Sequence, residues 1–285
     1  MFGLHINKDS IRQSDNLFVA IRDSYNQSVK DGMPIKSYQV FIANPRNRKW
    51  TVDDEIMKQI REFNVRQHLK CIVHSTYLDH PWGDLTKASV KSSIGFIKRE
   101  LEFCDKMKAK GLVVHLPTTM TPQEIEHNLI KLGDNKSKAK ILLEMDVVSI
   151  SKAIYNKPET LNELMKVIRR NGLSSKFGLV IDTAHVYHMG TKLKTKRQMN
   201  EFLNGIKEIG LRRSNLIFHL NDDKNEAGYK RDEHTCLTTG KIWSDGHEGL
   251  QKLVKFLKRN KLIAIFEGKR YDDYVCNMNI VQALF

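Results

Sequence analysis

The stretch Gly178-Leu-Val-Ile-Asp182, followed by Thr183-Ala-His185, combines the two patterns that recur along this chain. Its aliphatic residues form a short run without alternation of apolar and polar side chains, which is typical of a strand buried on both faces. The run ends on an aspartate, and a histidine follows three residues later, where the chain turns. The stretch therefore predicts a buried parallel strand whose carboxyl end carries metal-binding side chains.

Seven further runs of this kind lie on either side of it, separated by amphipathic segments with helical spacing. The eight runs are Phe2–Ile6, Tyr38–Ala43, Cys71–His74, Gly111–His115, Ile141–Glu144, Gly178–Asp182, Leu216–Asp222 and Leu262–Glu267. Alternating strands and helices are typical of α/β proteins, and eight units in 285 residues favour one (β/α)8 TIM barrel. We therefore expect a single domain over residues 1–285; an open doubly wound sheet is the alternative architecture.

Local signals predict where some of the helices begin. Thr121-Pro122-Gln123-Glu124 has the form of a capping box with proline at the first helical position. Thr51, with Asp54 three residues later, suggests another N-cap, opening a helix that runs to about Gln67.

Charge indicates the class of partner. The chain has 47 Lys and Arg against 33 Asp and Glu, a formal net charge of +14. Such an excess favours polyanions such as nucleic acids, because basic side chains near phosphates release condensed counterions. The alternative is a general lysine bias of the source proteome. No stretch approaches the roughly 18 uninterrupted apolar residues of a membrane helix, and Met1–Asp9 lacks a signal-peptide pattern, so we expect an intracellular protein.

The four cysteines, Cys71, Cys104, Cys236 and Cys276, lie far apart and form no Cys-x-x-Cys pair. This spacing argues against a cysteine zinc site and against a disulfide framework. We expect reduced thiols.

Metal-ligand residues stand at or near the ends of six of the eight runs: His74, His115, Glu144, Asp182, His219 and Glu267. The carboxyl ends of barrel strands converge on one face, where active sites lie. So many polar side chains crowded at a barrel mouth need cations to offset their desolvation. Asp182 with His185, and Asp232 with His234, extend the set to nine, about right for three ions. Imidazole and carboxylate ligands without cysteine suit zinc, manganese or iron.

Several segments resemble the signature segments of the endonuclease IV family of AP (apurinic/apyrimidinic) endonucleases, in the family's order and spacing. They are Val73-His-Ser-Thr-Tyr-Leu78, Leu112-Val-Val-His115, Ile181-Asp-Thr-Ala-His185, His219-Leu-Asn-Asp222, Asp232-Glu-His234 and Leu237-Thr-Thr-Gly-Lys-Ile242. Residues Gln39–Arg46 and Tyr77–Trp82 look most like the viral branch of this family. The chain departs from the commoner pattern at Met145-Asp146, Gly268-Lys269 and Leu116-Pro117, which affects the loops rather than the ligands.

The resemblance implies a xylose-isomerase-like TIM barrel with three zinc ions (Zn2+), and with Mn2+ as an alternative at the third site. Glu144 would bridge two ions, the first also held by His74 and His115. The second would take Asp182, His219 and Glu267, and the third His185, Asp232 and His234.

The implied activity is base excision repair on double-stranded DNA with abasic sites. The enzyme would hydrolyse the phosphodiester 5′ to the lesion and leave a 3′-hydroxyl, with Glu144 as the catalytic residue. Arg46 and Tyr77 would enter the DNA helix, with Arg48 as the alternative arginine. One barrel acting on one lesion needs no partner subunit, so we expect a monomer, and the viral likeness permits the nucleus, the cytoplasm or the virion.

Further side chains are candidates for supporting roles. His5 is a candidate for contact with the metal ligands, and we expect Asn221 and Asp222 to orient His219. Lys192, Lys194, Lys196 and Arg197 form a basic loop on the expected catalytic side, where phosphate contact and simple solvation are both reasonable.

Two other functions remain open. A metal-dependent sugar isomerase or epimerase would use the same barrel with one or two ions, so the Asp232/His234 pair is the feature that discriminates against it. A non-catalytic nucleic-acid binder would have lost ligands, and the sequence has all nine.

Overall fold

A computed structural model describes residues 1–284 except 12, 148–149, 230–232 and 245. Eight parallel strands close into a barrel in the order β1-β10-β7-β6-β5-β4-β3-β2. They are β1 (Phe2–His5), β2 (Ser37–Phe41), β3 (Lys70–His74), β4 (Gly111–His115), β5 (Lys140–Glu144), β6 (Phe177–Asp182), β7 (Leu216–His219) and β10 (Ile263–Phe266). The barrel prediction is confirmed, and the open-sheet alternative is wrong because β10 pairs with β1.

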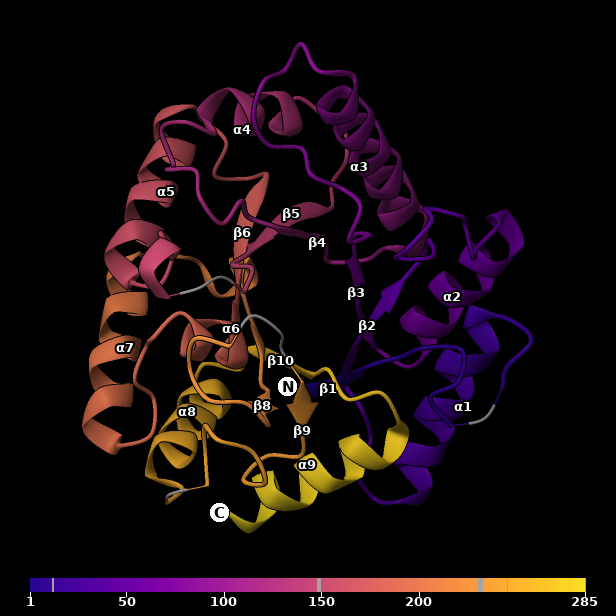
Figure 1. Cartoon of the computed structure of the whole chain (residues 1–285). Helices are drawn as coiled ribbons and strands as arrows, with labels where there is room; N and C mark the ends of the chain where they lie inside the picture. The colour runs from indigo at the N-terminus through magenta and orange to yellow at the C-terminus, as the bar shows by residue number, and fades with distance from the viewer. Residues whose placement is uncertain (12, 148–149, 230–232, 245, 285) are drawn as a thin grey trace.

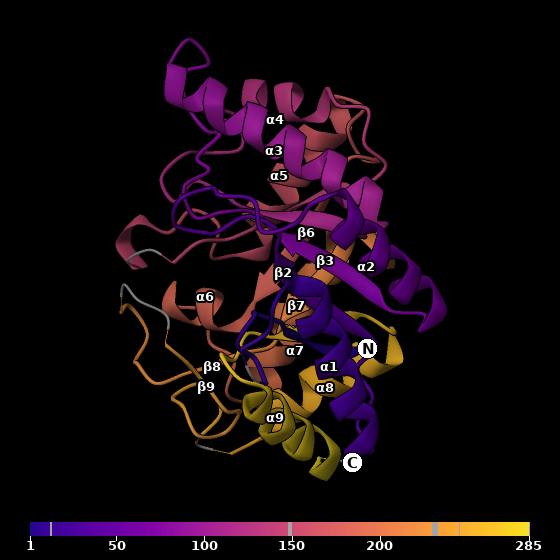
Figure 2. The same ribbon diagram turned by 90° about the vertical axis from the view of Figure 1, so that its right-hand side faces the viewer.

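Helices surround the barrel, as Figure 1 shows. The outer helices are α1 (Leu17–Lys30), α2 (Asp54–Arg66), α3 (Ala88–Met107), α4 (Glu126–Gly133), α5 (Pro158–Arg170), α7 (Lys196–Glu208), α8 (Glu248–Arg259) and α9 (Tyr271–Ala283). A short helix, α6 (Thr183–His188), follows β6, and two-residue strands β8 (Asp222–Asp223) and β9 (His234–Thr235) pair as an antiparallel ribbon. In Figure 2, α6 and this ribbon lie on the same side of the barrel. No described helix is long and apolar enough to cross a membrane.

The alternation of side chains along the strands shows where the predicted ligands lie in the barrel. Side chains two residues apart on a strand point to the same face. An apolar cluster separate from the main core consists of Ile72, Val113, Leu142, Val180, Ile217 and Ile265, and it fills the barrel interior. The residues two positions further along are His74, His115, Glu144, Asp182, His219 and Glu267. The predicted ligands therefore follow the apolar layer directly, at the carboxyl end of the barrel.

Strands β1 and β2 continue this layering and approach each other closely. A Cβ added to Gly3 would lie 1.9 Å from the carbonyl oxygen of Ser37, so only glycine permits the approach. Two residues further along, His5 and Gln39 are paired in register. These two side chains thereby join the same layer as the predicted ligands.

Two helix starts differ from those predicted. Helix α2 begins at Asp54, but its N-cap is Asp53, whose carboxylate accepts a hydrogen bond from the Ile56 amide at 2.8 Å. Thr121 and Glu124 do exchange hydrogen bonds, yet they form a turn, and α4 begins only at Glu126. In both places the helix begins two or more residues later than the sequence pattern predicted, because the observed hydrogen bonds differ from the predicted cap.

The expectation of reduced thiols is wrong for one pair of cysteines. Cys236, directly after β9, forms a disulfide with Cys276 in α9, with a Cα–Cα distance of 6.1 Å. Cys71 and Cys104 are free and buried. The pair was not predictable from spacing, because 40 residues separate the two cysteines and only the closure of the barrel places α9 beside the ribbon.

Candidate metal centre

A first group of ligand atoms comes from β3, β4 and β5. His74 Nε2 lies 3.4 Å from Glu144 Oε2, and His115 Nε2 lies 3.3 Å from the same oxygen. Glu144 is fully buried, and its Oε2 has no hydrogen-bond partner among the described residues. A buried carboxylate oxygen faced by two imidazole nitrogens matches the donor set of a divalent cation.

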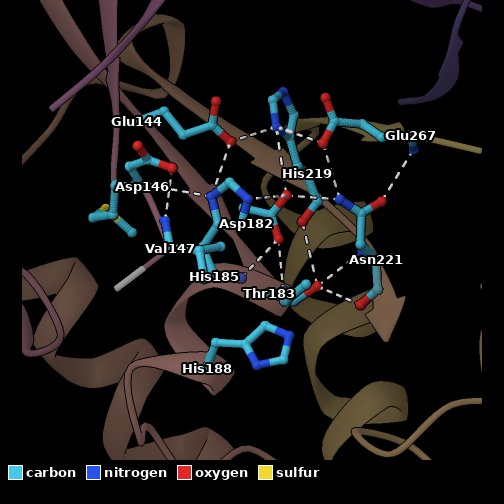
Figure 3. Close-up of polar contacts among 12 residues, drawn as sticks. Glu144, Asp146, Val147, Asp182, Thr183, His185, His188, His219, Asn221 and Glu267 are labelled. Carbon is cyan, nitrogen blue, oxygen red and sulfur yellow. Dashed lines mark hydrogen bonds and ion pairs between the residues drawn. The ribbon is translucent and has the colours of Figure 1, made fainter. Parts of the chain in front are cut away.

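A second group shares the other oxygen of the same carboxylate (Figure 3). His219 Nδ1 lies 2.7 Å from Glu144 Oε1 and 3.1 Å from Glu267 Oε2. Asp182 Oδ2 lies 3.7 Å from the same ring nitrogen. Glu144 therefore stands between the first group and the second, as a bridging ligand would.

A third group contains Asp182, His185 and His234, whose ligand atoms lie within 4.8 Å of one another. Asp182 positions this group locally, because its carboxylate accepts hydrogen bonds from the amides of Ala184 and His185 and so caps α6. His234 comes from the ribbon strand β9. The predicted third-site residue Asp232 lies outside the described residues.

Hydrogen bonds fix which nitrogen of each imidazole faces the centre. The His74 Nδ1–H donates to the carbonyl oxygen of Ser75 at 2.7 Å, and the His185 Nδ1–H donates to that of Met145 at 2.6 Å. His115 Nδ1 lies 3.5 Å from Asp146 Oδ1. At His74 and His115 these contacts leave Nε2 facing Glu144, and at His185 they leave Nε2 4.0 Å from Asp182 Oδ2. Metal-bound imidazoles are usually held through their second nitrogen in this way.

The electrostatics of the cluster require positive charge. Among the described residues, the ion pairs of Glu144, Asp182 and Glu267 are all with histidines. Burial alone would raise the pKa of Glu144, but the charge of His219 and its hydrogen bond to the carboxylate hold that pKa well below its ordinary value.

The histidines respond in the opposite direction. Burial disfavours the charged form of His219, yet Glu144 and Glu267 raise its pKa well above its ordinary value. Burial likewise opposes protonation of His115, but Asp146 and Glu144 raise its pKa to about 10. The carboxylates therefore favour positive charge at this centre, and bound divalent ions would supply that charge in place of protons. The residues fit a cluster of divalent ions.

A cavity of about 1000 Å³ opens over this cluster. Its lining includes Phe41, Tyr77, His80, Lys224, Lys269 and Arg270 together with six of the ligand residues, His74, His115, Glu144, His185, His234 and Glu267. Tyr77 is 53% exposed, and its ring centroid lies 5.8 Å from that of His74 and 6.0 Å from that of His115. An aromatic side chain thus projects at the edge of the candidate metal centre.

The two candidate arginines differ in their surroundings. Arg46 is exposed, and no hydrogen bond or ion pair joins its guanidinium to the described residues. Arg48 Nη2 contacts Asp79 Oδ1 at 2.7 Å, the carbonyl oxygen of Leu78 at 2.9 Å and Ser93 Oγ at 3.1 Å. Arg48 is therefore engaged beneath the Tyr77 loop, which leaves Arg46 as the arginine available to a ligand.

Other predictions about supporting residues are corrected here. Asn221 does not contact the His219 ring; its Nδ2 donates to Asp182 Oδ2 at 2.7 Å and to Glu267 Oε2 at 3.0 Å. Asp222 accepts hydrogen bonds from the Gly240 and Ile242 amides and so organises a loop. The partner of His219 Nε2 is the side-chain oxygen of Gln39, which sequence reasoning missed.

The basic loop does not belong to the cavity. None of its four predicted cations, Lys192, Lys194, Lys196 and Arg197, lines the cavity over the cluster. Arg197 is mostly exposed and pairs with Glu201 on its own helix at 3.8 Å. The simpler interpretation, a solvated charged segment, suits Arg197.

The fold and the site together define a (β/α)8 barrel with a cluster of metal-ligand residues at its mouth. Residues 33–272 match the family model described as a xylose isomerase-like TIM barrel, so the chain belongs to that family.

Two curated relatives of the chain carry the names probable AP endonuclease and probable endonuclease 4. The chain is 31% identical over 243 residues to a probable AP endonuclease of African swine fever virus, covering 83% of this chain and 80% of the relative. A probable endonuclease 4 of Nitrosopumilus maritimus is 29% identical, with coverage of 90% and 93%. The crystal structure of AsfvAP:AG superposes with a TM-score of 0.92 at 28% identity, covering 100% of this chain and 98% of that one. The predicted family and its viral likeness are confirmed.

Proposed function

We propose that this protein is a zinc-dependent AP endonuclease. It hydrolyses the phosphodiester 5′ to an abasic site in double-stranded DNA and leaves a 3′-hydroxyl, a step of base excision repair. We also propose that residues 1–285 form one such domain and act as a monomer. The names of the relatives support the nuclease activity, and the site supports the metal chemistry.

The observation that carries the proposal is the position of Glu144. One of its oxygens faces His74 and His115, and the other faces His219. A carboxylate between two groups of ligands would hold two ions, and paired ions suit phosphodiester hydrolysis. Glu144 is buried at the barrel mouth and lines the floor of the cavity, so ions held beside it would face the side from which a DNA backbone can approach.

The three groups support the ligand assignment that the sequence predicts. His74, His115 and Glu144 would hold the first ion, and Glu144, Asp182, His219 and Glu267 the second. His185 and His234, with Asp232, would hold the third, which we expect to be zinc or manganese. When bound, such ions lower the pKa of coordinated water and stabilise negative charge on phosphate oxygens.

The side chains around the mouth suit a damaged duplex. Tyr77 projects beside the cluster and can stack in the gap left by a missing base, where pairing and stacking are already lost. Lys224 and Lys269, both exposed, line the same cavity and are available to backbone phosphates. Arg46 is the free arginine for insertion.

The sugar-isomerase alternative is less well supported. It needs one or two ions, whereas His185 and His234 bring a further pair of imidazoles to the centre.

The test is cleavage of a duplex oligonucleotide with one tetrahydrofuran abasic mimic, beside the matched intact duplex. The mimic cannot undergo β-elimination, so a nick on its 5′ side with a 3′-hydroxyl that a polymerase extends identifies hydrolysis. We expect Glu144→Gln to reduce cleavage by more than about 100-fold, since even outer partners of metal ligands change activity by about 10–100-fold.

Glu126→Gln is the matched control. Glu126 is an ion-paired glutamate on an outer helix, held by Arg170, and has no contact with the cluster. The proposal is wrong if the zinc-loaded protein does not nick the mimic, or if Glu144→Gln and Glu126→Gln cleave equally well.

A further inference from the structure

Gln39 occupies the ligand layer without being a predicted ligand. It lies on β2, is fully buried, and follows Ser37 by the same two-residue step that places the ligands of the other strands. Its partners are 180 and 228 residues away in the chain, on β7 and just after β10. Burying a neutral amide costs free energy unless its polar atoms form hydrogen bonds, so the partners of the Gln39 amide explain why it can be buried here.

All the hydrogen-bonding groups of this amide are used toward the centre. Gln39 Oε1 lies 2.8 Å from His219 Nε2. Gln39 Nε2 lies 2.7 Å from Glu267 Oε1 and 3.1 Å from His5 Nδ1. The amide thus joins two residues of the second ligand group and one histidine of the barrel interior.

The chemistry of these partners fixes the orientation of the amide. An ionised Glu267 can only accept hydrogen bonds, so the amide must turn its NH2 toward Glu267. Its carbonyl oxygen then faces His219 and requires a proton on Nε2 of that ring. In the neutral ring this leaves the lone pair on Nδ1, the nitrogen that lies 2.7 Å from Glu144 and 3.1 Å from Glu267.

We propose that Gln39 is a positioning residue for the second metal ion. Its amide oxygen holds His219 in the tautomer that presents Nδ1 to the ion, and its amide nitrogen holds Glu267 in place beside that ring. This inference rests on the proposed function. It adds a role at the same site for a residue that binds no ion itself. His74 and His185 are held by backbone carbonyls instead, so the first and third ions do not depend on Gln39.

The test measures zinc binding without DNA. Protein freed of metal is titrated with zinc against a competing chromophoric chelator, and cobalt is added in parallel for its visible absorption. We expect Gln39→Met, which is similar in length but forms no such hydrogen bonds, to weaken one of three ions by about 10–100-fold and to leave the other two unchanged. The cobalt spectrum should lose the contribution of that one site.

Tyr38→Phe is the matched control on the same strand. The Tyr38 hydroxyl donates to Asn64 Oδ1 at 2.9 Å on the outer side of the barrel, so its loss removes a buried hydrogen bond that does not reach the cluster. We expect this variant to bind three ions as the wild type does, even where its melting temperature falls.

A second variant covers the case in which Gln39→Met does not fold. Gln39→Glu keeps the size of the side chain and an acceptor for His219, but it replaces the donor facing Glu267 with a carboxylate. We expect the same single ion to be weakened. The inference is overturned if the folded variants bind all three ions with wild-type constants, or if all three constants change by the same factor. A wild-type protein that binds no zinc would overturn the proposed metal centre itself, and a wild type that binds zinc without nicking DNA would overturn only the proposed activity.

Discussion

The guanidinium of Arg48 lies 2.7 Å from the carboxylate of Asp79, whose side chain is fully buried. This ion pair spans the loop after β2 and the loop after β3, and the second of these carries Tyr77. Thr76 donates a further hydrogen bond to Asp79. The exposed aromatic ring therefore rests on a loop that is fixed from beneath.

The two arginines should separate stability from DNA binding. Arg48→Ala leaves the buried carboxylate unpaired and should lower the free energy of unfolding by about 2 kcal/mol, because hydrogen bonds to charged groups contribute about 1.5–3 kcal/mol. Arg46→Ala should leave the free energy of unfolding unchanged and weaken binding to abasic DNA. If this arginine neutralises a phosphate, the slope of log K against log salt concentration should become shallower by about one unit. Denaturant unfolding measures the stability of each variant, and DNA binding at several salt concentrations measures its affinity. If Arg48→Ala weakened DNA binding and Arg46→Ala did not, Arg48 would be the DNA contact.

Tyr77→Ala should impair recognition of the lesion without emptying the metal centre. Stacking of an aromatic ring on a base contributes about 1–3 kcal/mol, so affinity for the abasic duplex should fall by about tenfold or more. Zinc content should stay as in the wild type, because the ring lies beside His74 and His115 and supplies no ligand atom. Equal affinity of the variant and the wild type for abasic DNA would exclude Tyr77 from the interface.

Glu100 predicts a particular pH dependence of stability. It is fully buried on α3, accepts a hydrogen bond from Ser75 Oγ at 2.5 Å, and its pKa is raised well above the ordinary 4.5 by burial. The folded protein keeps this proton over a pH range in which the unfolded chain has lost it. The free energy of unfolding should therefore fall as pH rises above about 4.5, up to the folded-state pKa.

Glu100→Gln removes this contribution. The variant should gain in melting temperature relative to the wild type as pH rises from about 5 to about 8. A difference that does not change with pH would contradict the assignment. The comparison requires only thermal unfolding of the two proteins in matched buffers.

The disulfide between Cys236 and Cys276 predicts a thiol count and a loss of stability on reduction. Under denaturing conditions without reductant, two thiols should react, those of Cys71 and Cys104. A disulfide that joins residues 40 positions apart stabilises the folded state by up to about 4 kcal/mol in the chain-entropy model. Reduction, or Cys236→Ser, should remove that amount and loosen the ribbon that carries His234. A count of four reactive thiols would contradict the pairing, and a reductant should have no further effect on Cys236→Ser.

Much of the fold was predictable because its signals are local. A buried parallel strand is a continuous apolar run, and a ligand at its carboxyl end stands next to that run, as in Gly178–Asp182. Closure of the sheet then brings the strand ends together without any further information. Eight of the nine predicted ligands are described, and they lie in three groups at one mouth.

The contacts that tune the site were not predictable, because they join residues far apart in the chain. Gln39 reaches His219 across 180 residues, and nothing near either residue indicates the contact. One signal was available: Gln39 follows Ser37 by the step that separates Val180 from Asp182, which places it in the ligand layer once the barrel is assumed. Asn221 was placed beside the correct ligands, but its backbone position turns its amide toward Asp182 and Glu267 instead of the neighbouring His219 ring.

The most direct test of the central claim is nicking of the tetrahydrofuran duplex by metal-free protein as zinc is added in known equivalents. We expect no nicking without metal and full activity only near three equivalents, with the break on the 5′ side of the mimic and an extendable 3′-hydroxyl. Full nicking by the metal-free protein, or no nicking by protein that holds three zinc ions, would contradict it.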